Sequence, residues 1–353
     1  MKTTYVLGAG ASSDMGYPFA KSMGSGLFAW MAQHTSSGPY DFRSAAESLR
    51  TTFEQVDDIE DLLARIDESI SEATGTTLQR RCVASQLANH DKPALVEAIR
   101  GWFDEVRQGA SESYGLFGRH LVQPGDCIIS FNYDVSLERE LRLTGVWNLG
   151  DGYGFAIEGF EDHSPVRLLK LHGSINWLAS MFGGVKHGPI ALGSGGVFGR
   201  RPVLANSELI FLGYSNVSDS LFPQDGTPAL RPLILPTRCK KFYFDTNLGC
   251  EWEEFWDFLW GTAAQVLRES DRVVICGYSL PLVDERACRL LLGAEPYSGH
   301  VDVCCGDETG SIVERFKARG RDAQATDQKY FGEWVKAQAR MGIPEVNTRF
   351  SAS

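Results

Sequence analysis

Near its N-terminus the chain reads Thr3-Thr4-Tyr5-Val6-Leu7-Gly8-Ala9-Gly10-Ala11-Ser12-Ser13-Asp14, and this stretch decides the fold. Residues 3–7 are largely β-branched and apolar, as in one buried parallel strand. The turn Gly8-Ala9-Gly10 lets the backbone approach a ligand closely, because glycine has no Cβ. The Ser-Ser-Asp sequence that follows can cap or open a helix. A strand, a glycine-rich turn and a helix N-terminus together predict a cradle for a pyrophosphate.

This motif departs from the dinucleotide-binding fingerprint in two respects. It reads G-x-G-x-x-S, with Ser13 where the third glycine is expected. No strand with a ribose-binding acid follows about 20 residues later. The stretch alone therefore leaves two interpretations open: a phosphate cradle, or a tight strand-to-helix turn without a ligand.

Composition and charge exclude several classes of function. The chain has 353 residues, of which 43% are hydrophobic and 22% charged, so it can bury a full core. Its net charge of −11 argues against direct binding to nucleic acids or to anionic membranes. No apolar run is long enough to span a bilayer, and Met1-Lys2 leads straight into a strand rather than a signal peptide. None of the eight cysteines forms a C-x-x-C pair, so we expect no metal site and a cytoplasmic protein.

The order of strand-like and helix-like segments predicts an α/β fold, a doubly wound, Rossmann-like parallel sheet with an inserted helical module. The insert has a helical pattern throughout, with one apolar helix face formed by Ile59, Leu62, Leu63, Ile66 and Ile70. Strands are expected at 3–7, 127–131, 166–171, 272–276 and 301–304, with shorter ones at 208–213 and 233–235. Helices are expected at 19–31, 136–143, 252–267, 284–292 and 311–317.

The domain boundaries follow from these elements. We expect the sheet core in 1–35, 122–178 and 208–330, the helical module in 36–121, a Gly-rich loop or small subdomain in 179–207, and a C-terminal tail in 331–353. The aromatic stripe of the helix at 252–267 is interpreted as core or subunit interface. The acidic run at 57–61 is interpreted as a solvated helix start.

Small or polar residues follow four of the expected strands. These motifs are Gly8-Ala9-Gly10, Asn132-Tyr133-Asp134, His172-Gly173-Ser174 and Gly277-Tyr278-Ser279. In an open parallel sheet, ligands bind outside the carboxyl ends of the strands, at the point where the strand order reverses. The four motifs therefore predict one shared ligand site along that edge.

Together these motifs resemble a known family. Gly-Ala-Gly-Ala-Ser at 8–12, Phe-Asn-Tyr-Asp at 131–134, Leu-His-Gly-Ser at 171–174 and Gly-Tyr-Ser-Leu at 277–280 occur in the order found in sirtuins. The sequences of these motifs are similar to those of the sirtuin-like NAD-hydrolysing proteins of prokaryotic anti-phage defence, and the resemblance extends over about residues 3 to 310. The resemblance implies an NAD-binding domain in which NAD is the substrate.

The resemblance also implies roles for individual residues. Asn132 and Asp134 stand where the family contacts the nicotinamide-ribose and the carboxamide, and His172 stands at the catalytic histidine. The implied NAD-binding positions are Gly8, Ala9, Gly10, Ser12, Gly173, Gly277, Ser279 and, near the adenine, Asp307 beside Gly306.

One departure from the family bears on the reaction. A deacetylase sirtuin carries four cysteines in two C-x-x-C pairs after its histidine, whereas this chain has no cysteine between His172 and Cys239. The zinc module is thus absent or replaced by the Gly-rich segment, which puts the acyl-peptide groove in doubt. We therefore expect NAD hydrolysis without a metal rather than deacetylation.

The chemistry that these residues offer suits cleavage of the nicotinamide–ribose bond. The bond breaks through an oxocarbenium-like state with neutral nicotinamide leaving, so the protein must position the ring and stabilise positive charge. Asn132 can orient water or a ribose hydroxyl, His172 can take a proton near neutral pH, and Asp134 can stabilise the cation or hold the carboxamide. From the residues alone, a strand-end histidine such as His172 is more often a structural hydrogen-bonding residue. Asn132 and Asp134 are also compatible with helix capping, and Ser279 with turn chemistry.

The expected function is hydrolysis of NAD to nicotinamide and ADP-ribose by a defence effector that depletes the cell of NAD, as in abortive infection. Such an activity must be held off until a partner or assembly triggers it. We expect a homo-oligomer, and the resemblance names a HerA-type ATPase or a short Argonaute as a partner, with the helical insert as contact surface. Two alternatives remain open: an NAD-dependent protein deacylase or ADP-ribosyl transferase, and a non-catalytic NAD or ADP-ribose sensor.

Overall fold

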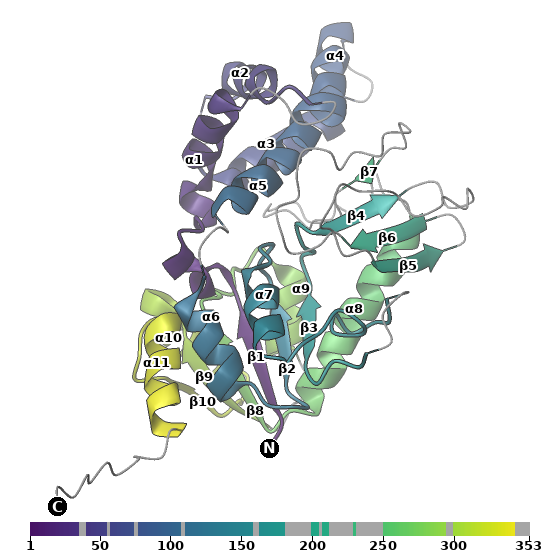
Figure 1. Ribbon diagram of the computed structural model, residues 1–353. Coiled ribbons are helices and arrows are strands. Elements are labelled where there is room, and N and C mark those ends of the chain that lie inside the picture. Colours follow the sequence, from purple (N-terminus) through teal and green to yellow (C-terminus); the bar gives the residue numbers. More distant parts are fainter. Residues whose placement is uncertain are drawn as a thin grey trace, which may run out of the picture.

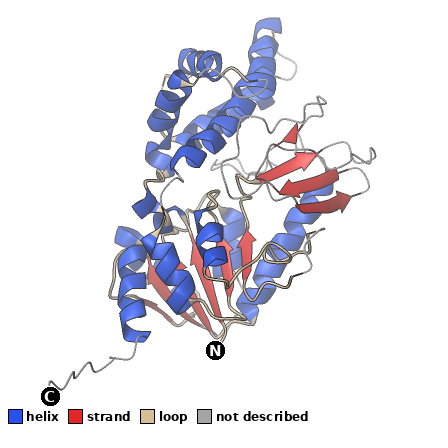
Figure 2. Ribbon diagram, viewed as in Figure 1, coloured by secondary structure: helices blue, strands red, loops and turns tan. Residues whose placement is uncertain are grey.

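The computed structural model covers the whole chain. It describes residues 1–34, 40–54, 57–73, 77–106, 110–157, 162–180, 199–204, 207–211, 229–230, 250–293 and 299–342. A central sheet is flanked by helices on both sides, and a layer of helices and a smaller sheet lie beyond one of its edges (Figures 1 and 2).

The central sheet has six strands in the order β10-β9-β8-β1-β2-β3, and every neighbouring pair is parallel. The order reverses between β1 and β8, which is the arrangement of a doubly wound, Rossmann-like sheet. The predicted fold class is therefore confirmed. The strands are β1 (Thr3–Leu7), β2 (Cys127–Ser130), β3 (Arg167–Lys170), β8 (Arg272–Cys276), β9 (His300–Cys304) and β10 (Ala323–Ala325).

The register of these strands places their carboxyl ends in one row. Leu7 lies opposite Ser130 on one side and Cys276 on the other. Ser130 in turn lies opposite Lys170, and Cys276 lies opposite Cys304. The four motifs picked out from the sequence therefore all leave the same edge of the sheet.

A second sheet is antiparallel, with strand order β5-β6-β4-β7. Its strands are β4 (Trp177–Ser180), β5 (Gly199–Leu204), β6 (Ser207–Phe211) and β7 (Ala229–Leu230). The short strand expected at 208–213 corresponds to β6, and the one expected at 233–235 lies outside the described residues. β5 falls within the predicted Gly-rich segment, most of which is likewise outside them.

The first helices after β1, from α1 to α5, form a layer beyond the carboxyl edge of the central sheet (Figure 1). They are α1 (Ala20–Gln33), α2 (Phe42–Thr52), α3 (Ile59–Glu72), α4 (Leu78–Gln86), η3 (Leu87–Asp91) and α5 (Lys92–Val106). This layer has its own apolar core, which also takes in Tyr133, Val135 and Ile175 from the segments after β2 and β3. The layer is thus packed directly on the loops that carry two of the four motifs.

The remaining helices pack against the central sheet. They are α6 (Glu112–Leu116), η4 (Phe117–Leu121), α7 (Ser136–Leu143), α8 (Cys250–Arg268), α9 (Glu285–Leu292), η7 (Gly306–Glu308), α10 (Thr309–Lys317) and α11 (Phe331–Gly342). Tyr114 and Phe117, from the end of the predicted insert, join the core of the sheet, as does Trp334 of α11 from the segment assigned to the tail. The domain boundaries themselves stay a prediction. No helix in the described part of the chain is long and apolar enough to cross a membrane.

The first turn differs from its expected form. After β1 the chain makes two short 3₁₀ turns, η1 (Ala9–Ala11) and η2 (Ser13–Met15), and the first α-helix starts only at Ala20. No side chain caps either turn, and Gly16, with φ of 85°, ends the second. Pro18 disfavours helical geometry in the residue before it. The expected α-helix N-terminus beside the glycine turn is therefore not formed.

The glycines of this turn are needed for contact with the turn after β8. A Cβ on Gly8 would lie 2.6 Å from Cα of Tyr278, and one on Gly10 would lie 2.7 Å from Cα of Gly277. Gly277 has φ of +63°, and a Cβ there would lie 2.3 Å from the backbone nitrogen of Ala11. The Gly10 N–H donates to the Gly277 carbonyl oxygen at 2.8 Å. Backbone therefore meets backbone across β1 and β8, with no room for a side chain.

This contact predicts that Gly277→Ala destabilises the protein by about 2–5 kcal/mol, because it combines a left-handed backbone with overpacking. The matched control is Gly310→Ala in α10, where an added Cβ has no neighbour within 4 Å, and which should be neutral or stabilising by up to about 1 kcal/mol. Urea unfolding of both variants measures the difference. Equal stability of the two would contradict the contact.

Candidate active site

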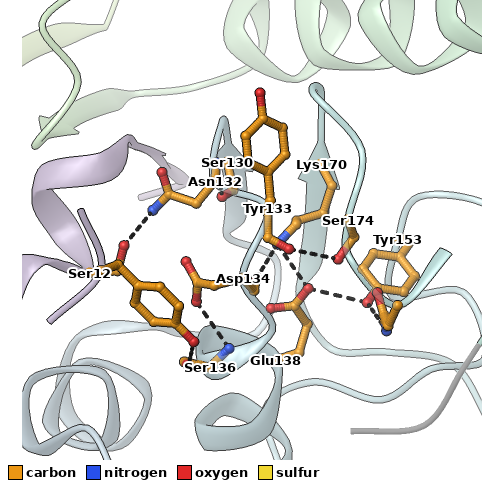
Figure 3. Close-up of polar contacts among 12 residues, drawn as sticks. Ser12, Ser130, Asn132, Tyr133, Asp134, Ser136, Glu138, Tyr153, Lys170 and Ser174 are labelled. Atoms are coloured by element: carbon orange, nitrogen blue, oxygen red, sulfur yellow. Dashed lines mark hydrogen bonds and ion pairs between the residues drawn. The ribbon is translucent and has the colours of Figure 1, made fainter. Parts of the chain in front are cut away.

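The amide of Asn132 connects the end of β2 to the first glycine turn. Its Nδ2 donates to the carbonyl oxygen of Gly8 at 2.9 Å and to Oγ of Ser12 at 3.3 Å. Figure 3 shows this side chain directed at Ser12. These hydrogen bonds hold together three residues of the predicted ligand site: Gly8, Ser12 and Asn132. Burial raises the pKa of the Tyr114 hydroxyl in α6 well above its ordinary value, and the neighbouring Ser12 and Asn132 side chains act in the opposite direction.

Asp134 is buried two residues further along the same loop. Its Oδ1 accepts a hydrogen bond from the N–H of Ser136, the first residue of α7, at 3.0 Å. Burial raises the pKa of Asp134, and the nearby Lys170 ammonium acts in the opposite direction. Asp134 therefore supports the start of a helix, which is the structural alternative that the sequence leaves open. Asn132 does not, since its amide bonds to Gly8 and Ser12 instead.

A buried lysine, Lys170 at the end of β3, holds this loop in place. Its Nζ donates to the carbonyl oxygen of Asp134 at 2.5 Å and lies 3.1 Å from Oε1 of Glu138. The same Oε1 accepts the hydroxyl of Tyr153 at 3.2 Å, and Tyr153 accepts Nδ2 of Asn176 at 3.2 Å (Figure 3). Lys170 and Glu138 are at most 1% exposed, and burial raises the pKa of Glu138.

This network was not expected from the sequence, although a signal was present. The strand expected at 166–171 is apolar apart from Arg167 and Lys170, and Lys170 lies only two residues before His172. A charged side chain inside a buried strand requires a partner, so Lys170 indicated a buried acid nearby. The spacing alone did not identify Glu138 as that acid.

His172 is paired with a carboxylate from a distant part of the chain. Its Nε2 lies 3.1 Å from Oδ2 of Asp284, with side-chain exposures of 9% and 1%. Asp284 is the N-cap of α9, where its Oδ1 accepts the N–H of Ala287 at 3.2 Å. Its Oδ2 also accepts the hydroxyl of Tyr278 at 2.8 Å. Asp284 was expected only as the first residue of a helix, so its pairing with His172 is new.

Aromatic rings connect the His172 pair to the Asn132 group. Phe131, which precedes Asn132, stacks on Tyr278 at 4.0 Å between centroids and meets the His172 ring edge-on at 4.9 Å. Trp260 of α8 lies 6.4 Å from the His172 ring. Residues from β1, β2, β3 and β8 therefore form one continuous set at the sheet edge.

The remaining residues of the predicted ligand site are Gly173, Ala9, Ser279 and Asp307, and they differ in backbone geometry and exposure. Gly173 follows His172 with φ of +81°, which favours glycine there. Ala9 and Ser279 are exposed at the same edge. Asp307, after β9, is 84% exposed and forms an ion pair with Lys329. The structure thus brings the other ten predicted residues to the ends of β1, β2, β3 and β8, whereas Asp307 follows β9 and faces outward.

The acidic run at 57–61 begins a helix, as expected, and its acidic residues are exposed or partly exposed. Asp58 is the N-cap of α3, accepting the N–H groups of Glu60 and Asp61 at 2.9 and 3.3 Å. Burial is the main reason why the pKa values of Tyr133 and Tyr278 are raised, and the charge of the half-buried Glu60 adds to both shifts.

Comparison with known proteins yields structural likeness only. No protein-family model matches the chain, and no curated protein sequence matches it. A crystal structure of a Sir2 homologue–NAD complex matches at 14% identity with a TM-score of 0.49, covering 96% of this chain and 88% of the other. A mutant Sir2 homologue with 2′-O-acetyl-ADP-ribose matches at 13% identity with a TM-score of 0.45, covering 96% and 91%. Sir2 bound to an acetylated peptide matches at 13% identity with a TM-score of 0.43, covering 97% and 93%.

The likeness to Sir2 structures is distant and extends over nearly the full length of the chain. The narrower resemblance to defence proteins stays an expectation from the sequence. Within the residues that the structure describes, no three histidine, cysteine or acidic side chains are grouped so as to hold a metal ion.

The buried network predicts that Lys170→Met destabilises the protein by about 3–5 kcal/mol, because it leaves buried carboxyls uncompensated. The double variant Lys170→Met with Glu138→Gln should regain part of that loss. Lys317→Met is the control, since Lys317 forms only an exposed ion pair with Glu314 and should change nothing measurable. Denaturant midpoints compare the three, and an unchanged Lys170→Met would show that the pair contributes no net stability.

Glu138 also predicts a dependence of stability on pH. Burial raises its pKa, so as pH increases the unfolded chain releases this proton before the folded chain does. The stability of the wild type relative to Glu138→Gln should therefore fall as pH rises above about 4.3, the ordinary pKa of glutamate. Unfolding free energies of both proteins between about pH 4 and 8 test this. A difference that is constant, or that grows in favour of the wild type, goes against it.

Proposed function

We propose that this protein hydrolyses NAD to nicotinamide and ADP-ribose, as an anti-phage defence effector that is held inactive until a partner or assembly triggers it. The observation that carries the proposal is the joining of two groups at one sheet edge. Asn132 is fixed against the Gly8 turn, and His172 is fixed against Asp284, with Phe131 between them. Their order along the chain is that of the NAD-binding motifs of sirtuins.

Each residue has a role that its surroundings support. The Gly8–Ser12 turn and the Gly277–Ser279 turn, which lie against each other at the switch point, hold the phosphates and ribose of NAD. Asn132, whose amide is anchored to Gly8 and Ser12, orients the nicotinamide ribose or the attacking water.

His172 takes a proton from that water or from a ribose hydroxyl. Asp134, buried with its carboxylate on Ser136, fixes the loop that carries Asn132 and adds negative charge near the developing cation. Gly173 lets the chain turn directly after His172, and Asp307 serves the adenine end of NAD.

The helical layer supports the proposed control of this activity. Its core includes Tyr133, which directly follows Asn132, and Ile175, which lies three residues after His172. A partner that binds the layer can therefore act on the site through packed side chains rather than over a distance. A HerA-type ATPase or a short Argonaute is the proposed partner, and self-association of this chain is proposed alongside it.

The test is release of nicotinamide from NAD by the purified protein, alone and with the products of neighbouring genes. Asn132→Ala and His172→Ala should each lower turnover by about 100- to 10,000-fold, the range of general acid–base and positioning effects. His163→Ala is the matched control: its side chain is 93% exposed beside Asp151, and its removal should leave turnover unchanged.

Three outcomes speak against the proposal. Full turnover in both site variants would show that Asn132 and His172 do not have the catalytic roles assigned to them. NAD consumption only when an acyl-lysine peptide is present identifies a deacylase. Tight NAD binding without nicotinamide release, with every partner supplied, identifies a sensor.

A further inference from the structure

Among the residues that the structure describes, Leu280 is the one non-glycine residue with a left-handed backbone. It lies three residues after Gly277 in the turn that follows β8, and its φ is +49°. Its side chain is fully buried. The Cβ of leucine makes this backbone conformation unfavourable, so it persists only where the surroundings impose it. The turn after β8 is therefore held in its conformation by contacts from other elements.

Arg315 of α10 supplies such a contact. Its Nη1 donates to the carbonyl oxygen of Leu280 at 2.5 Å. Its Nη2 donates to Sγ of Cys288 in α9 at 3.4 Å, and the same Sγ donates to the carbonyl oxygen of Pro281 at 3.4 Å. A guanidinium stays charged and presents its donors in a rigid fork, so it can fix two acceptors at once. Arg315 thereby ties the end of this turn to α9 and α10.

Ser279 is the exposed residue within the same turn. Tyr278 before it is buried, with its ring stacked on Phe131 and its hydroxyl donating to Asp284. Leu280 after it is buried as well. The backbone of Ser279 is therefore fixed from both sides, while its side chain is presented at the carboxyl edge of the sheet.

We propose that Arg315 is a positioning residue: by holding the left-handed turn at Leu280, it fixes Ser279 for contact with the ADP-ribose part of NAD. The identity of the ligand rests on the proposed function, in which this turn holds phosphate and ribose, but the fixing of the turn does not. A preorganised turn avoids the cost of being ordered when the ligand binds. Because Arg315 acts through the turn and not on the nicotinamide–ribose bond, its loss should raise KM and leave kcat unchanged.

Arg315→Gln is the informative variant, because glutamine is shorter than arginine and carries no charge. Arg315→Lys keeps the charge and a donor, so its effects should lie between those of the wild type and Arg315→Gln. Arg319→Gln is the matched control, since it makes the same change at an exposed position just after α10. Ile312→Val is the second control: it removes a buried methyl group from α10 and lowers stability without altering the turn.

The first measurement is hydrogen exchange of the backbone amides in residues 277–284. These amides should exchange about 10- to 100-fold faster in Arg315→Gln, the factor expected for loss of a hydrogen bond from a charged group. In both controls they should exchange as in the wild type. Equal exchange in the wild type and Arg315→Gln, or equal acceleration in Ile312→Val, overturns the proposal without any need for NAD.

The second measurement is calorimetric binding of ADP-ribose and of NAD. Both Kd values should rise about 10-fold in Arg315→Gln, as for one lost ligand hydrogen bond, because the two ligands share the part that Ser279 contacts. The controls should bind like the wild type. Unchanged affinity in Arg315→Gln, or a weakened affinity for NAD alone, overturns the role of Arg315.

The inference and the proposed function fail separately. Release of nicotinamide by the wild type, together with unchanged binding in Arg315→Gln, overturns the inference alone. Binding of ADP-ribose that depends on Arg315, without any release of nicotinamide when every partner is supplied, overturns the proposed function alone.

Discussion

The structure depends on the contact between two glycine turns at the point where the strand order reverses. Gly8 and Gly10 after β1 approach Gly277 and Tyr278 after β8 so closely that a Cβ on any of the three glycines would overlap backbone. Hydrogen bonds from Gly8 to Cys276 and from Gly10 to Gly277 fix this approach. Because the turns are packed on each other, the residues that follow them are placed relative to both halves of the sheet at once.

Buried charged residues fix the part of the sheet edge that β2 and β3 form. The ammonium of Lys170 reaches the carbonyl oxygen of Asp134 and the carboxylate of Glu138, so the loop after β2 is tied to the end of β3. Removing these charges from water is unfavourable unless geometry and hydrogen bonds compensate for it. Tyr153 supplies one such bond to Glu138, and Asn176 supports Tyr153. The charges therefore act mainly by fixing one position for the loop that carries Asn132.

Local sequence rules predicted those parts of the fold and site that local chemistry controls. The prediction succeeded for the strand at Thr3–Leu7, the helix at Ser136–Leu143 and the polar residues at the strand ends. Each of these depends on hydrophobic periodicity, secondary-structure propensity or turn residues that can be read within a few positions of the sequence. The pairing of His172 with Asp284 was not predicted, since 112 positions separate them and only tertiary packing joins them. Likewise the glycines were predicted to approach a ligand, and the nearest neighbour proved to be backbone. The three-residue strand at Ala323–Ala325 was missed because Ala-Gln-Ala is too short to establish a period and has no β-branched residue.

The helical layer is packed directly on the loops at the sheet edge, which bears on the control proposed for the site. Tyr133 belongs to the core of the layer, yet its ring lies 6.5 Å from that of His172. Ile175 donates its N–H to the carbonyl oxygen of Tyr133, which joins the loops after β2 and β3. Packed interiors respond to displacement by switching between discrete arrangements rather than by gradual deformation. A shift of the layer would therefore move Tyr133 and the loops around Asn132 and His172 together, so the site is expected to be either assembled or disrupted as a unit.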